Sequence, residues 1–274
     1  MAYKNILVHV DESANIAATL KAACIIAVKN KSHLTGIHVI PHLDTPLYVE
    51  GSVPAGLIKA QQQAAEETAA RAKAQFQKAI DESGCLSEWC EPKGFVDEEI
   101  VRQGRYSDLI VIGQSGNVTK PTAGHALENQ VLLTSSRPVL VVPYIGIKDD
   151  IGRRIMVAWN GSMEATRAVN DAMPLLQAAK TVEVISIVNK NEAEDVPAAD
   201  MCIYLARHNV VSEAVKSQSG ELSTSNILLN RAADHSIDLI VMGAYGHSRL
   251  REWILGGATY NILKNMTVPV LMSH

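Results

Sequence analysis

The sequence predicts an α/β fold that consists of two tandem, doubly wound, five-stranded parallel sheets with helices on both faces. Short apolar runs alternate with segments of helical periodicity, and this alternation is typical of βαβ units joined by right-handed crossovers. The series of elements restarts near residue 152, so the second half of the chain repeats the first. With 274 residues, the chain is long enough for two domains of ordinary size.

The expected elements of the first half alternate between strand and helix. Ser13 is placed to cap the first helix, because its hydroxyl can accept a hydrogen bond from a free N–H group. Gly84 is expected to end a long helix rich in Ala, Gln and Glu. The expected strands are residues 4–11, 34–40, 87–92, 108–112 and 138–142, and the expected helices are residues 14–30, 56–83, 97–106 and 126–135.

The internal repeat is clearest at the first and fourth strands. NILVHVDES at residues 5–13 aligns with RIMVAWNGS at 154–162, and DLIVIGQSG at 108–116 aligns with DLIVMGAYG at 238–246. The fifth strands, PVLVV and PVLMS, also align. The second copy is shorter, mainly because residues 198–208 stand where the first copy has its long helix. We therefore predict one domain over residues 1–145 and a second over residues 152–274.

Composition and charge argue against several classes of protein. The net charge is -4 and the basic residues are scattered, so we expect no binding to nucleic acid. No apolar run approaches the ~20 residues of a membrane helix, and the N-terminal stretch does not have the pattern of a signal peptide. The cysteines, Cys24, Cys85, Cys90 and Cys202, lack metal-type spacing and are expected to be reduced thiols. We expect a cytoplasmic protein.

The candidate functional site lies in residues 238–259. An apolar run at 239–242 predicts a strand that is covered on both faces, and it ends at Gly243. Residues 256–259, Gly-Gly-Ala-Thr, stand where a further helix would begin. A helix start offers free N–H groups and a positive dipole end, which suit a phosphate. Two glycine-opened segments could therefore close around a polyphosphate from two sides.

The spacing of Gly243, Gly246 and Gly256 resembles the Gly-x2-Gly-x9-Gly-(Ser/Thr) signature of the universal stress protein family. Gly257 stands where the family has Ser or Thr, so one phosphate-binding hydroxyl is missing, although Thr259 lies close by. The resemblance covers nearly the whole chain as two tandem copies. It implies the strand order 3-2-1-4-5 in each sheet, with the fifth strands paired as an internal pseudo-dimer. Because apolar edge strands are hazardous unless covered, PVLVV and PVLM support that pairing.

The resemblance also implies which residues contact an adenine nucleotide. The backbone of Ala158, Trp159 and Ile187 is expected to flank the adenine, and Asn160 offers its amide to ribose hydroxyls. Because Asn160 brings no negative charge, it is a poor ligand for magnesium. The predicted site comprises Ala158, Trp159, Asn160, Ile187, Met242, Gly243, Gly246, His247, Ser248, Arg249, Gly256, Gly257, Ala258 and Thr259.

Structural interpretations of the same residues stay open. The glycines could serve only in turns and close packing, and Asn160 could be a cap or turn residue before Gly161. His247 and Arg249 could be solvated loop residues rather than phosphate ligands, and Trp253 could anchor the last helix in the core.

The first half has an altered version of the glycine pattern. Its turn at residues 113–116 keeps both glycines, but Ala126 occupies the place of the third glycine and Pro121 interrupts the segment between them. We therefore predict that the first half binds no nucleotide well. Asp11 matches the nucleotide-contacting acid of the family, and it could also cap a helix.

No constellation of nucleophile, base and orienting group can be assembled from the sequence. There is no phosphate-binding loop of the Gly-x4-Gly-Lys-Ser/Thr type and no Gly-x-Gly-x-x-Gly after a strand. We predict a stress-response regulator that binds ATP or a related adenine nucleotide, with or without Mg2+, and hydrolyses it slowly or not at all. An unidentified protein partner and a further homodimer are also considered. The alternatives are an interaction or scaffold module that binds no nucleotide, and a nucleotide hydrolase or transferase.

Overall fold

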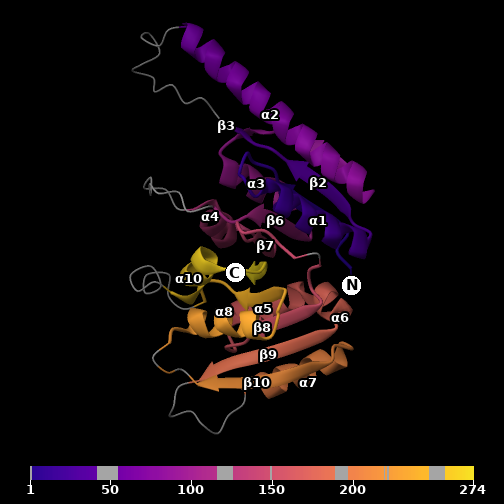
Figure 1. The fold of residues 1–274 in the computed structure, drawn as a ribbon, viewed down its shortest axis with the longest axis vertical. Coiled ribbons are helices and arrows are strands. Elements are labelled where there is room, and N and C mark those ends of the chain that lie inside the picture. Colours follow the sequence, from indigo (N-terminus) through magenta and orange to yellow (C-terminus); the bar gives the residue numbers. More distant parts are fainter. Residues whose placement is uncertain are drawn as a thin grey trace.

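The strands of the protein form one continuous ten-stranded sheet in the order β10-β9-β8-β11-β12-β7-β6-β1-β2-β4 (Figure 1). The structure is a computed structural model, and it describes residues 2–41, 55–115, 126–148, 150–188, 197–218, 220, 222–246 and 257–274. Each half contributes five parallel strands in the order 3-2-1-4-5, which confirms the predicted doubly wound topology. The short strands β3 and β5 form a separate pair.

The first half contains β1 (Asn5–His9), α1 (Ile16–Asn30), β2 (His33–Ile37), β3 (Ile40–Pro41), α2 (Ala55–Ser83), β4 (Leu86–Cys90), β5 (Lys93–Gly94), α3 (Val96–Gly104), β6 (Leu109–Gly113), α4 (Leu127–Thr134) and β7 (Val139–Val142). The second half contains β8 (Arg154–Ala158), α5 (Met163–Asp171), α6 (Met173–Ala178), β9 (Thr181–Val188), α7 (Pro197–Arg207), β10 (Ser212–Gln218), α8 (Thr224–Asp234), β11 (Leu239–Gly243), α10 (Ala258–Asn265) and β12 (Val270–Ser273). The 11-residue α7 stands where the first half has the 29-residue α2, as the sequence predicts.

The two halves join through their fifth strands. β12 pairs with β7 in antiparallel orientation, with Val270 opposite Val141 and Leu271 opposite Leu140. Every residue of both strands is buried. The pairing of two apolar fifth strands within one chain, predicted above, is therefore confirmed.

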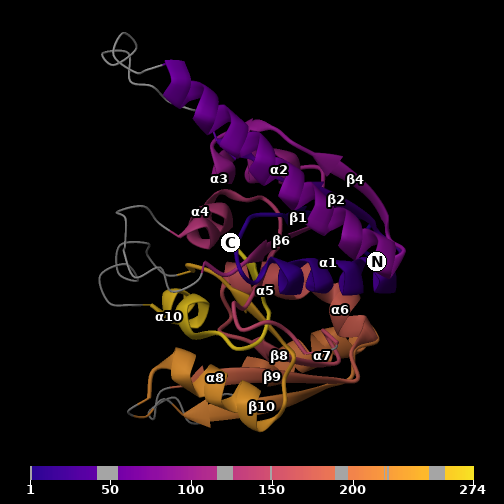
Figure 2. The ribbon, with the colours of Figure 1, turned by 45° about the horizontal axis from the view of Figure 1, so that its top comes forward.

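Helices cover both faces of the sheet, in three layers (Figure 2). One core cluster contains residues from α1, α2, α5, α6 and α7 together with alternate residues of the strands. The opposite cluster contains residues from α3, α4, α8 and α10. Within β1, Ile6 and Val8 face the first cluster and Leu7 faces the second, as the two-residue period of a strand requires.

An aspartate before the fourth strand of each half ties that strand to the start of the first. The Asp238 carboxylate accepts hydrogen bonds from the backbone N–H groups of Gly152 at 2.8 Å and Arg153 at 3.1 Å. Asp108 accepts in the same way from Lys4 at 2.6 Å and Asn5 at 3.0 Å. These bonds satisfy backbone donors at the N-terminal ends of β1 and β8, which explains why the repeated segment begins with Asp.

The predicted cap of the first helix is wrong. Asn15 is the N-cap residue of α1, and its side chain makes no capping hydrogen bond. Ser13 instead donates to Oδ1 of Asp11, from its backbone N–H at 3.1 Å and from its hydroxyl at 2.5 Å. Ser13 lies too far before the helix to cap it because this Asx turn takes up additional residues.

Gln114 joins the two halves next to the paired strands. Its side chain is 3 % exposed, and its Nε2 donates to the backbone carbonyl of Leu263 at 2.6 Å. Its Oε1 accepts from the backbone N–H of Tyr144 at 2.9 Å. A residue of the first-half glycine turn therefore satisfies the C-terminal end of α10 in the other half.

Substitution Gln114→Ala should lower the free energy of unfolding by about 1–3 kcal/mol, because it leaves buried backbone groups without partners. The matched control is Gln61→Ala, which removes the same side chain from an exposed position of α2. Denaturant unfolding followed by circular dichroism measures both. Equal stabilities of the two variants would contradict the assigned role of Gln114.

Candidate functional site

A cavity of about 240 Å³ lies at the carboxyl ends of β8, β9 and β11. β8 stands between β9 and β11, so the winding direction of the second-half sheet switches there, and ligands of such folds bind at this point. The lining residues are Ala158, Trp159, Asn160, Ser162, Ile185, Ile187, Thr224, Leu228, Met242, Gly243, Tyr245, Gly246, Ala258 and Thr259.

Nine of the predicted site residues line this cavity. They are Ala158, Trp159, Asn160, Ile187, Met242, Gly243, Gly246, Ala258 and Thr259. Gly257 is the N-cap residue of α10, directly before Ala258. The remaining predicted residues, His247, Ser248, Arg249 and Gly256, lie outside the described residues, as does Trp253.

Five lining residues were not predicted, namely Ser162, Ile185, Thr224, Leu228 and Tyr245. Two of them start helices: Ser162 caps α5 by accepting from the backbone N–H of Ala165 at 3.1 Å, and Thr224 is the first residue of α8. A helix-start signal in the sequence could have indicated these two, because helices that follow strands in such folds begin at the ligand edge. The apolar side chains of Ile185 and Leu228 carry no such signal.

Asn160 makes a turn directly after the end of β8. The backbone N–H of Trp159 donates to the carbonyl of Ile185 at 2.8 Å, which extends the pairing with β9 past Ala158. Asn160 then accepts through Oδ1 from the backbone N–H of Ser162 at 3.1 Å. This turn matches that of Asp11 and Ser13, so the turn interpretation of Asn160 has direct support. Its Nδ2 has no partner in the described part of the chain.

The two glycines of the turn have different neighbours. A Cβ at Gly243 would lie 2.5 Å from the backbone nitrogen of Ala165, so glycine is needed there for α5 to pack against β11. A Cβ at Gly246 would lie 2.6 Å from Oε2 of Glu164 and 3.4 Å from Oγ of Ser162. Glycine at position 243 therefore lets α5 pack against β11. Glycine at position 246 avoids a clash with side-chain oxygens at the rim of the cavity.

The turn and the start of α10 lie together. Tyr245 has a positive φ of 56°, and its backbone N–H donates to Oγ1 of Thr259 at 3.2 Å. Among the described residues no side chain caps the N-terminus of α10, and its first turn contains no acidic residue. The cavity is therefore bounded on one side by a helix end with a positive partial charge.

The corresponding place in the first half contains an acid. Ala126 is the N-cap residue of α4, as Gly257 is of α10, so Ala126 corresponds to Gly257 and not to Gly256. The spacing misplaced it because the first-half segment is one residue shorter. In this register, Glu128 corresponds to Thr259.

Glu128 is 4 % exposed and has partners. Its carboxylate accepts from the Ser115 hydroxyl at 2.6 Å and from the Ser115 backbone N–H at 3.3 Å. The turn and helix start of the first half are thus bridged by a negatively charged side chain, where the second half uses the neutral hydroxyl of Thr259.

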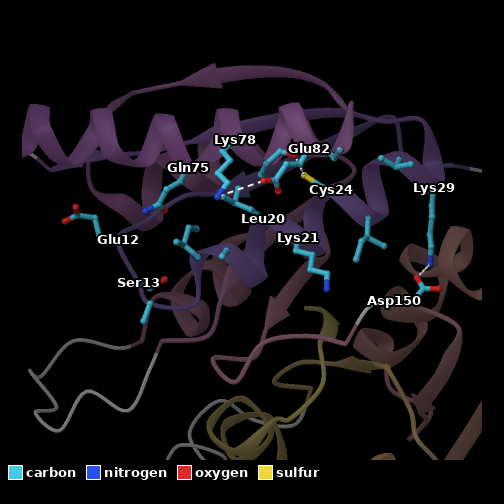
Figure 3. A pocket seen from close by; sticks show the side chains of 17 residues that line it. Glu12, Ser13, Leu20, Lys21, Cys24, Lys29, Gln75, Lys78, Glu82 and Asp150 are labelled. Carbon is cyan, nitrogen blue, oxygen red and sulfur yellow. Dashed lines mark hydrogen bonds and ion pairs between the residues drawn. The ribbon is translucent and has the colours of Figure 1, made fainter.

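A larger cavity of about 1020 Å³ lies between α1 and α2, away from the strand ends of the second half (Figure 3). Its floor includes Leu20 and Cys24, and its rim carries Lys78 and an ion pair between Lys29 and Asp150. Burial raises the pKa of the Cys24 thiol to about 11, so this thiol is a weak nucleophile at neutral pH. None of the described lining residues is a glycine, and the predicted site has no part in this groove.

The described residues contain neither a cluster of metal ligands nor a membrane-spanning helix. No group of three or more His, Cys, Asp or Glu side chains there could hold a metal ion. Among the helices that the structure describes, none has the length and apolar character to cross a membrane.

Comparison with known proteins gives a consistent result. A family model described as the universal stress protein family matches residues 2–143 and 152–274. The universal stress protein Slr1230 of Synechocystis is 25% identical over 171 residues, which cover 60% of this chain and 57% of that protein. The match thus spans less than two thirds of that relative.

Solved structures share the fold. A universal stress protein from Archaeoglobus fulgidus superposes with a TM-score of 0.77 at 18% identity, covering 97% of this chain and 94% of that chain. A functionally unknown protein from Pseudomonas aeruginosa, PA1789, gives 0.61 at 18% identity, covering 98% and 92%. At this level of identity the likeness concerns the fold alone.

The two glycines of the turn should differ in their tolerance of a methyl group. Gly243→Ala should lower the free energy of unfolding by about 1–3 kcal/mol, because its Cβ meets backbone atoms that cannot move. Gly246→Ala should cost less than about 1 kcal/mol, because its Cβ comes closest to the end of the flexible Glu164 side chain, which can move, and makes an ordinary contact with Oγ of Ser162. Denaturant unfolding of both variants measures the difference, and the opposite ranking would contradict this account.

Proposed function

Because the chain belongs to the universal stress protein family, we propose that it is a stress-response regulatory protein that binds ATP or a related adenine nucleotide in its second half. The observation that carries this proposal is the cavity itself. It brings the strand ends, the turn at Gly246 and the uncapped start of α10 to one place. A nucleotide needs an apolar slot for its base and N–H donors for its phosphates. The cavity offers apolar side chains on one side and the start of α10 on another.

The lining suggests how the nucleotide lies. Ile185, Ile187 and Leu228 form apolar surface beside the end of β8, which suits the adenine ring. Asn160 and Ser162 are polar lining residues that directly follow β8, and we assign them to the ribose. The phosphates then reach Gly246 and the first turn of α10, where the helix dipole favours negative charge.

We propose that the first half, residues 1–145, does not bind a nucleotide, and that residues 152–274 form the nucleotide-binding domain. The Glu128 carboxylate lies between the turn and the start of α4, bonded to Ser115. A phosphate at this turn would lie next to the buried negative charge of Glu128. It would also lack the backbone N–H of Ser115 as a donor, because that N–H already donates to Glu128. Repulsion between two such anions in a poorly solvated site is strong.

The cavity also favours a binding role over catalysis. None of its described lining residues is Asp, Glu, His, Lys, Arg or Cys, so the described lining offers no general base. In this proposal the bound phosphates order the turn, and the Tyr245 hydroxyl, which donates to Oδ1 of Asn129 at 2.5 Å, links that turn to α4 of the other half. An unidentified protein partner would then recognise the ordered surface.

A scaffold that binds no nucleotide is the second candidate function. It is favoured by Gly257, which replaces the Ser or Thr of the family signature, and by the turn role of Asn160.

Isothermal titration with ATP separates these two functions. The wild-type protein should bind ATP with a dissociation constant below millimolar. Gly246→Val should weaken binding at least about tenfold, equal to 1.4 kcal/mol, because its branched side chain projects toward Glu164 and Ser162 at the cavity rim. Gly56→Val is the control, because a Cβ at Gly56 has open space around it. A wild-type protein without measurable affinity would favour the scaffold.

Turnover of ATP should be much slower than ~1 per second, the lower range of ordinary enzymes, because the described part of the cavity lining has no general base. Phosphate release measured under saturating ATP tests this expectation. A rate at or above that range would make the protein a nucleotide hydrolase instead.

A further inference from the structure

Two cysteine side chains of the first half lie together beside the groove between α1 and α2. Cys24 belongs to α1, and Cys85 follows 61 residues later, directly before β4. The Cys85 thiol donates to the backbone carbonyl of Cys24 at 3.7 Å, and the Ser83 hydroxyl donates to Sγ of Cys85 at 3.3 Å. The Cys24 thiol donates to the carbonyl of Ala79 in α2 at 3.8 Å.

The two thiols also contact each other. Burial is the main cause of the raised pKa of Cys24, and a hydrogen bond with the Cys85 thiol contributes to it. Two sulfurs must come within bonding distance to form a disulfide, so only neighbouring thiols do so without movement of the backbone. The other cysteines, Cys90 and Cys202, lie elsewhere, in β4 and α7.

The second half shows that the fold does not require a thiol at this place. Gly84 and Asn209 both have a left-handed backbone, with φ of 70° and 61°, just before the edge strands β4 and β10. The next residue is Cys85 in the first half and Val210 in the second, and Val210 is 2 % exposed. Packing at this position is therefore satisfied by an aliphatic side chain.

The groove gives small solutes a way to the pair. Cys24 and Ser83 both line it, where α1 faces the last turns of α2 (Figure 3). Cys85 is partly exposed, whereas Cys24 is buried, and both are free thiols in this structure. Since oxidation favours the more accessible sulfur, Cys85 is the first to react with an oxidant.

We propose that Cys24 and Cys85 are a reversible oxidation site, at which hydrogen peroxide converts the two thiols into a disulfide. The Cys85 sulfur attacks one peroxide oxygen, the O–O bond breaks, and a sulfenic acid and one water form. The Cys24 sulfur then bonds to the Cys85 sulfur, the S–O bond breaks, and the hydroxyl leaves with the Cys24 proton as a second water. The two sulfurs lose two electrons, which the peroxide gains, and a dithiol reductant reverses the reaction.

The disulfide would tie α1 to the edge of the sheet. Near its other end, α1 holds the connection between the halves, because Lys29 forms an ion pair with Asp150 and donates to the carbonyl of Ile151 at 2.8 Å. Oxidation therefore fixes α1 between β4 and this connection. The site is separate from the second-half cavity, so it does not depend on nucleotide binding.

The test uses the full chain with Cys90→Ser and Cys202→Ser, which keeps only the proposed pair. After treatment with hydrogen peroxide and denaturation, maleimide should label neither remaining cysteine, and the intact mass should fall by two hydrogen atoms. Digestion should give a peptide that links Cys24 to Cys85, and dithiothreitol should restore both thiols. The wild-type protein should give the same linked peptide.

The control adds Cys85→Val to the same chain, because valine stands at the corresponding place in the second half. This variant should fold, as judged by circular dichroism, and should form no intramolecular disulfide. Hydrogen exchange of α1 should be slower in the oxidised pair than in the reduced pair, since a cross-link restricts local opening.

Three results would overturn the oxidation site. They are two free thiols after a peroxide treatment that fully oxidises free cysteine, oxidation to sulfinic acid without a cross-link, and a disulfide that joins two chains. A thiol pair that serves packing alone gives the first of these results. Unchanged hydrogen exchange in the oxidised protein would overturn the fixing of α1.

Discussion

The antiparallel pairing of β7 with β12 is the interaction on which the rest of the structure depends. It turns two five-stranded sheets into one sheet of ten strands and buries two apolar edges that would otherwise be exposed. It also brings the turn of each half against the last helix of the other. Gln114 reaches α10 and Tyr245 reaches α4, so the second-half cavity is supported partly by the first half.

One scaffold, used twice, gives two different sites. Both halves tie the fourth strand to the first through an aspartate, and both start their last helix without a side-chain cap. They differ at several corresponding positions, among them the one where the first half has Glu128 and the second has Thr259. In the function we propose, the Glu128 carboxylate disfavours an anion at the first-half turn, whereas the Thr259 hydroxyl leaves the start of α10 without a negative charge. Divergence of duplicated domains thus needs no change of topology.

Few charged groups surround the described part of the second-half cavity, and each lies at a defined position. The described lining is neutral, the start of α10 contributes a partial positive charge, and Glu164 lies just behind Gly246. The link from Tyr245 to Asn129 gives a route by which an occupied turn can affect α4.

The sequence by itself determined the two copies, the strand order implied by the family resemblance, the pairing of the fifth strands, and most of the cavity residues on β8, β9 and β11. These follow from local patterns, because an apolar run favours a strand, and a glycine a turn, at its own place in the sequence. Only the tertiary structure decided that α5 packs on Gly243, that α8 supplies Thr224 and Leu228, and that Glu128 and Glu164 lie beside their turns. Those contacts join segments far apart in the sequence, and their geometry depends on helix packing that no local pattern encodes.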